Sequence, residues 1–186
     1  YLDWYDECNS FLDTNGFNAF FPNVDAMTSS LGDVTMYYHG RIIENIRSGN
    51  TDDGYTINGW AAPNMVNQSQ VADLYRNPCG NPKILEYYNR PLYIAIKARN
   101  KIVKSSGTAF LDFYLINEKG IHGTHTIDVT MTFQDGKELF NKVFEGKIRG
   151  GEEYGQELMT DVAVPLPFRH GYARCKAVLR DEDGTV

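Results

Sequence analysis

Cysteine is scarce in this 186-residue sequence, which has only Cys8, Cys79 and Cys175. A structural zinc site needs cysteine or histidine ligands in close pairs, and these three residues lie far apart. Cys175 alternates with apolar neighbours in a strand-like run, so we expect it to be a small thiol in a core. The sequence therefore predicts no metal site and no cofactor.

Excess positive charge and long apolar runs are also missing. The formal net charge is -6, so the chain lacks the basic surface that binding to a phosphate backbone requires, and we expect no nucleic-acid partner. No apolar run approaches the roughly 18 to 20 residues that span a bilayer, which argues against a membrane partner. The sequence starts without methionine, so upstream sequence with a targeting signal stays open, and these residues do not reveal the compartment.

Residue patterns that carry catalysis are absent as well. Glycoside hydrolysis needs two carboxyl groups across the scissile bond, whereas the acid pairs at 52–53 and 152–153 fall in a turn and a glycine-rich loop, which is typical of solvated surface charge. His122 and His125 lie in a loop, and a metal site there would have to recruit Asp128; polar surface is the simpler interpretation. No nucleophile elbow, phosphate loop or dinucleotide fingerprint occurs.

The first half of the sequence has helical periodicity. Apolar residues three and four apart predict a helix over residues 1–12 that stops at Asn15-Gly16, and a second helix from about Ser29 to Gly49. The core-facing stripe expected on the second helix is Leu31, Val34, Tyr38, Ile42 and Ile46. A short apolar run over residues 55–60 predicts a buried strand, residues 61–70 predict a loop, and residues 82–88 predict a short helix with a proline at its start.

From residue 92 onward the hydrophobic period changes from about 3.6 to 2, which predicts strands. The expected strands are residues 92–97, 108–116, 126–133, 138–145, 157–166 and 172–180. Asp135-Gly136 lies between two of these runs and predicts a hairpin turn. Short strands at this spacing are typical of an immunoglobulin-like sandwich, although the disulfide and tryptophan of antibody domains are absent.

The two halves therefore predict a mixed fold with a boundary near residue 90. We interpret residues 1–90 as the α/β terminal portion of a (β/α)8 TIM barrel, because eight strand–helix units need about 250 residues and the segment is too short for a whole one. Residues 91–186 form the all-β immunoglobulin-like sandwich in this interpretation. The last residues predict a hairpin turn and the start of a further strand, so we expect a final strand to be missing and a sheet edge to be unpaired.

Several segments, in this order, carry a resemblance to a known family. They are residues 53–60 (Asp-Gly-Tyr-Thr-Ile-Asn-Gly-Trp), 71–78 (Val-Ala-Asp-Leu-Tyr-Arg-Asn-Pro), 88–97, 112–118 and 170–179. Together they resemble the junction between barrel and sandwich in family-two glycoside hydrolases, the relatives of β-galactosidase, β-glucuronidase and β-mannosidase. The resemblance covers roughly residues 40–186.

The resemblance implies a retaining hydrolase of β-linked sugars that uses two glutamates on earlier barrel strands. Neither glutamate lies in this sequence, so we expect the chain alone to be inactive and to supply barrel rim and structural sandwich. Its expected partners are the carbohydrate substrate of the parent enzyme and the remainder of the barrel. The family also implies a periplasmic or extracellular location.

Asn58 and Trp60 are the candidate substrate-binding residues. They end the expected last barrel strand, and barrel enzymes build their active sites at the carboxyl ends of strands. An indole face can stack on a sugar ring and an amide can bind hydroxyls. The alternative for Trp60 is a structural role, buried between barrel and sandwich.

Two other classes of function stay open at this point. One is a stand-alone carbohydrate-binding or adhesion module with tyrosine and tryptophan side chains as a sugar platform, and the other is a purely structural interaction domain. A partial barrel would leave apolar faces uncovered, which favours homo-oligomers or aggregation. The sequence does not identify the sugar or its linkage.

Overall fold

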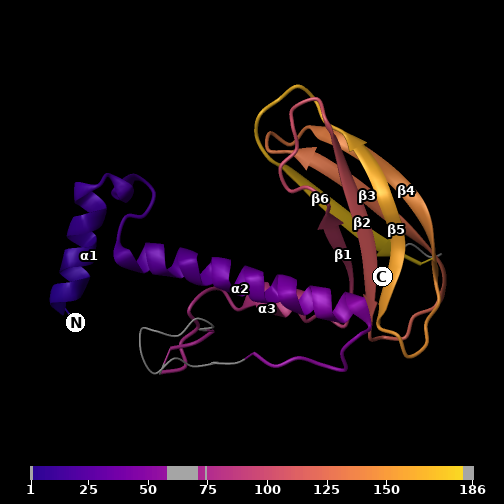
Figure 1. The fold of residues 1–186 in the computed structure, drawn as a ribbon, viewed down its shortest axis with the longest axis horizontal. Helices are drawn as coiled ribbons and strands as arrows, with labels where there is room; N and C mark the ends of the chain where they lie inside the picture. Colours follow the sequence, from indigo (N-terminus) through magenta and orange to yellow (C-terminus); the bar gives the residue numbers. More distant parts are fainter. Residues whose placement is uncertain (1, 58–70, 74, 182–186) are drawn as a thin grey trace. The chain divides into compact units, whose positions relative to one another are not determined.

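The computed structural model describes residues 2–57, 71–73 and 75–181, which fall into two compact units (Figure 1). The helical unit comprises Tyr1–Glu44 and Gly54–Asn89, and the sandwich unit comprises Asn45–Asp53 and Arg90–Val186. A helical amino-terminal part thus precedes six antiparallel strands in two sheets. The mixed fold predicted from the sequence is confirmed at this level.

The helical unit begins with α1 (Leu2–Thr14), which is followed by the short 3-10 helix η1 (Phe17–Ala19), and it ends with α3 (Lys83–Tyr88). Gly16, between α1 and η1, has a left-handed φ of 71°, a conformation that glycine adopts without steric cost. The predicted stop at Asn15-Gly16 is therefore confirmed.

The long helix α2 (Val24–Gly49) starts about one turn earlier than the sequence predicts. The side-chain oxygen of Asn23 accepts a hydrogen bond from the backbone N–H of Ala26 at 2.8 Å, which caps the amino end. The predicted start near Ser29 is wrong because Asn23 supplies a cap upstream of it.

The face of α2 that contributes to the core is also different from the predicted stripe. Met36 and Ile43 are buried in a cluster with Val71 and Leu85. Two glycines adjoin this face: a Cβ on Gly32 would lie 1.6 Å from the carbonyl oxygen of Cys79, and one on Gly40 would lie 2.0 Å from the Tyr88 ring. The predicted stripe is instead exposed, by 59%, 49%, 57% and 57%, at Leu31, Val34, Tyr38 and Ile42.

The strand predicted over residues 55–60 is not seen in the part of it that the structure describes. Residues 55–57 pair with no other described segment, and residues 58–60 and the predicted loop at 61–70 lie outside the described residues. A strand inside a sheet needs neighbours for its backbone hydrogen bonds. The described chain offers residues 55–57 no such neighbour.

All six strands predicted in the second half are present. They are β1 (Leu92–Ala98), β2 (Thr108–Asn117), β3 (Gly123–Phe133), β4 (Glu138–Ile148), β5 (Gly155–Pro165) and β6 (Ala173–Arg180). They form two three-stranded sheets, β1-β2-β5 and β4-β3-β6, which lie face to face in Figure 1. The predicted hairpin turn joins β3 to β4, with Gly136 at a φ of 83°.

The core lies between the two sheets, and the outer faces of the sheets differ. Phe113 and Leu115 of β2 and Val129 of β3 are fully buried inside. On the outer side, β3 exposes or half-exposes polar residues such as Thr130, whereas Tyr93, Ala95 and Ile116 of β1 and β2 form a second buried apolar cluster. One sheet is therefore built with a wet outer face, and the other is apolar on both faces.

Candidate functional site

The two site residues predicted from the sequence, Asn58 and Trp60, lie outside the described residues. Within the described ranges, no cluster of three or more histidine, cysteine or acidic residues is arranged to hold a metal ion. The acid pairs at 52–53 and 152–153 are exposed, as expected of surface charge.

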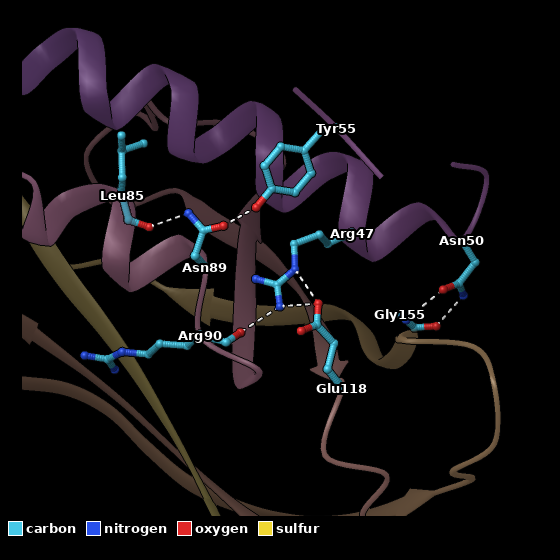
Figure 2. Close-up of polar contacts among 8 residues, drawn as sticks. All are labelled: Arg47, Asn50, Tyr55, Leu85, Asn89, Arg90, Glu118 and Gly155. Atoms are coloured by element: carbon cyan, nitrogen blue, oxygen red, sulfur yellow. Dashed lines mark hydrogen bonds and ion pairs between the residues drawn. The ribbon is translucent and has the colours of Figure 1, made fainter. Parts of the chain in front are cut away.

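The most elaborate polar arrangement in the sandwich unit fastens the last turn of α2 and the residues after it. We call it the junction clamp and define it by six residues. They are Arg47, Ser48 and Asn50 on the segment Asn45–Asp53, and Lys97, Glu118 and Gly155 on the sandwich. Figure 2 shows four of them, Arg47, Asn50, Glu118 and Gly155, converging from separate segments of the chain.

Arg47 provides the charged part of the junction clamp. Its Nε and Nη2 both donate to Oε1 of Glu118, at 3.1 and 2.7 Å, and Nη2 also donates to the carbonyl oxygen of Arg90 at 2.7 Å. The Arg47 side chain is only 7% exposed, whereas that of Glu118 is 39% exposed. A mostly buried guanidinium with several acceptors is positioned more firmly than a surface ion pair.

Asn50 and Gly155 provide the backbone part of the junction clamp. The Asn50 side chain donates from Nδ2 to the carbonyl oxygen of Gly155 and accepts from its N–H at 2.7 Å, as a neighbouring strand would (Figure 2). A Cβ on Gly155 would lie 2.6 Å from the carbonyl oxygen of Ser48 and 2.8 Å from that of Arg47. Only glycine fits there, because both obstacles are backbone atoms.

The remaining clamp contacts join the segment to the outer face of β1 and β2. Lys97 donates to the hydroxyl of the buried Ser48 at 2.8 Å, and its Nζ lies 4.5 Å from the centre of the Tyr114 ring. Burial raises the pKa of Tyr114. The Arg47 guanidinium lies 5.6 Å from the centre of the Tyr93 ring, so the segment covers part of the apolar outer cluster.

A second polar contact belongs to the helical unit alone. Asn89, at the end of α3, donates from Nδ2 to the carbonyl oxygen of Leu85 at 2.8 Å, and its Oδ1 accepts from the hydroxyl of Tyr55 (Figure 2). This contact ties residue 55, in the first segment of the family resemblance, to the carboxyl end of α3.

The sandwich also contains a hollow of about 300 Å³. It is lined by residues of both sheets and of the loops at one end, among them Ile96, Leu111, Met131, Leu166, Ala173 and Cys175. Burial raises the pKa of the Cys175 thiol to about 11, which makes it an unreactive, half-buried group. The hollow contains no arrangement of acids or nucleophiles suited to catalysis.

An exposed charge network lies on β1, β2 and the bulge in β5. Arg99 donates two hydrogen bonds to Asp112, at 2.9 and 3.0 Å, and pairs with Asp161. Asp112 also accepts from the backbone N–H of Asp161 at 2.8 Å, where the φ of Asp161 is 56°. Arg99 therefore lowers the pKa of the Asp112 carboxyl. This network stabilises a bulge and contains no group poised for proton transfer.

In comparisons with family models, curated proteins and solved structures, nothing matches this chain. In the part of the chain that the structure describes, no helix is long and apolar enough to cross a membrane. The junction clamp had no signal in the sequence, because Arg47 and Glu118 are 71 positions apart and neither belongs to a recognisable motif.

Proposed function

We propose that this chain is a non-catalytic carboxy-terminal part of a family-two-like glycoside hydrolase, in which the sandwich buttresses the end of a catalytic barrel. The observation that carries this proposal is the junction clamp. A sandwich with an autonomous role has no need of buried side chains and a glycine contact devoted to the end of a long helix. A buttress does need them, because it must hold a barrel helix in place.

The strand order is consistent with the immunoglobulin-like part of this proposal. In that fold, strands A, B and E share one sheet and strands C and F share the other. Taken in chain order, β1, β2 and β5 occupy the places of A, B and E, and β3 and β6 those of C and F. The order supports the family resemblance of residues 88–97 and 170–179.

The exposed stripe on α2 supports the barrel part of the proposal. Barrel helices contact the sheet on one side and neighbouring helices on the others, so they are apolar around much of their circumference. α2 has one apolar face buried in the helical unit and a second one, through Val34 and Tyr38, that is exposed. We infer that the second face is covered by the remainder of the barrel.

The buttress role predicts a specific effect on an active, upstream-extended polypeptide. Gly155→Ala should loosen the junction clamp and lower the temperature of heat inactivation, while kcat on the parent's sugar substrate at low temperature stays within about twofold of the wild type. Gly54→Ala is the matched control, since a Cβ there meets nothing within 4 Å. Equal heat inactivation of the two variants would remove the support that the clamp gives to the proposal.

A further inference from the structure

The β4-β3-β6 sheet ends at β6, and the free side of this strand is open to pairing. β6 pairs with β3 along its whole length, from Thr126↔Arg180 to Phe133↔Ala173. In an antiparallel ladder the N–H and C=O groups of alternate residues point away from the partner strand. In the described part of the chain no strand occupies the other side of β6, so these groups form a template for a further strand.

β6 lacks the devices that discourage pairing at two of the other edges. The β2–β5 ladder contains register shifts, Asp161 of β5 has a left-handed φ of 56°, and β5 ends at Pro165. The β3–β4 ladder contains a register shift as well. The β3–β6 ladder runs in unbroken register, and β6 contains no proline.

Space for additional side chains lies on the inner side of β6. Its inward residues Ala173, Cys175 and Ala177 are small, whereas the inward residues of the other bordering strand, β1, include Ile94 and Ile96. The hollow of about 300 Å³ is bordered by Ala173 and Cys175 of β6 and by Ile96 of β1. A strand added to β6 would bring its own inward side chains to this hollow.

The outer side of β6 sets the charge of the partner. Arg174, Lys176 and Arg180 share this side, and Arg180 already donates to Asp128 at 2.6 Å. Among the described residues, neither Arg174 nor Lys176 has an ion-pair partner, and both are exposed. Pairing of β6 with β6 of a second copy would oppose like charges, which destabilises a sheet, whereas acidic side chains would be attracted.

We propose that β6 binds an extended segment of a partner polypeptide as an added strand. Alternate residues of this segment are apolar and enter the hollow, and the residues between them are acidic and face Arg174 and Lys176. Backbone hydrogen bonds supply affinity and the alternating side chains supply specificity, as in other strand additions. The inference is independent of the proposed function, because it uses only the sandwich unit.

The test uses the 186-residue chain and short capped peptides. One peptide alternates valine with glutamate, the second alternates valine with lysine, and the third is the glutamate peptide with a central proline. The glutamate peptide should bind at least about tenfold more tightly than either control. Its binding should slow hydrogen exchange at alternate β6 amides and slow alkylation of Cys175. The variant with Arg174→Glu and Lys176→Glu changes only exposed side chains and should reverse the preference toward the lysine peptide.

Three outcomes would overturn the proposal. The first is that the glutamate peptide binds no better than the proline control to the wild-type chain, a comparison that needs no variant. The second is protection of β4 or β5 amides in place of β6. The third is protection of β6 that rises with protein concentration without peptide, which would identify a second copy as the occupant.

Discussion

At the scale of single residues, Arg47 connects the end of α2 to the sandwich. Its guanidinium is mostly buried, and it donates to both a carboxylate and a backbone carbonyl. Losing it leaves the carbonyl of Arg90 without this donor and removes the cation over the Tyr93 ring. The energetic effect should therefore exceed that of a surface ion pair.

Arg47→Met keeps most of the side-chain volume but removes these hydrogen bonds. We expect the opening free energy of the segment Asn45–Asp53 to fall by about 1–3 kcal/mol. Native-state hydrogen exchange at the amides of residues 45–53 measures this value. Arg149→Met is the matched control, since Arg149 is 66% exposed and lies 3.9 Å from its acidic partner, and it should change the value by less than about 0.5 kcal/mol. Equal effects of the two variants would show that Arg47 is an ordinary surface residue.

Asp112 makes the stability of the sandwich depend on pH. The hydrogen bonds from Arg99 lower the pKa of its carboxyl in the folded state, so folding favours the charged form. This contribution is fully present above the ordinary aspartate pKa and is lost as the pH falls through the lowered folded value. Asp112→Asn should therefore destabilise the sandwich at pH 7 and reduce the further loss between pH 7 and acid.

Urea unfolding of the sheet, followed by circular dichroism at several pH values, measures this effect. Asp52→Asn, at an exposed position in a turn, is the control and should leave the wild-type pH profile unchanged. If the Asp112→Asn variant keeps the full acid dependence of the wild type, the pair with Arg99 does not contribute to stability.

At the scale of elements, the strands could be predicted and the burial of α2 could not. Period-two alternation located all six strands because each has an inward face that must be apolar. On α2, the count of apolar side chains favoured the Leu31–Ile42 stripe, but the buried face contains Met36 with Gly32 and Gly40 beside it. Glycine adds nothing to an apolar pattern, although it allows the closest contact between backbones.

The exposed stripe on α2 predicts self-association of the isolated chain. Val34→Glu with Tyr38→Lys places a favourable i,i+4 pair on this face without touching the core, so the sedimentation coefficient at high concentration should fall toward the monomer value. Met36→Lys is the contrasting variant, because Met36 is fully buried and its replacement should unfold the helical unit. Unchanged self-association in the double variant would show that another surface is responsible.

At the scale of the whole molecule, distance along the chain limits what the sequence reveals. The clamp residues Asn50 and Gly155 are 105 positions apart, and their contact depends on the sandwich bringing β5 close to the residues after α2. The sequence predicted a change from helices to strands near residue 90, which local periodicity encodes. It did not predict that Asn45–Asp53 forms part of the compact unit with the strands. Such a contact follows from tertiary structure alone.

The central claim is that this chain supports catalysis but does not perform it. It is tested most directly by hydrolysis of a panel of nitrophenyl β-glycosides, with the 186-residue chain and with a polypeptide extended upstream along the same reading frame. The account predicts turnover of at least one β-glycoside by the longer polypeptide and none by the chain alone. Turnover by the 186 residues themselves, or an upstream frame that encodes no hydrolase activity, would contradict it.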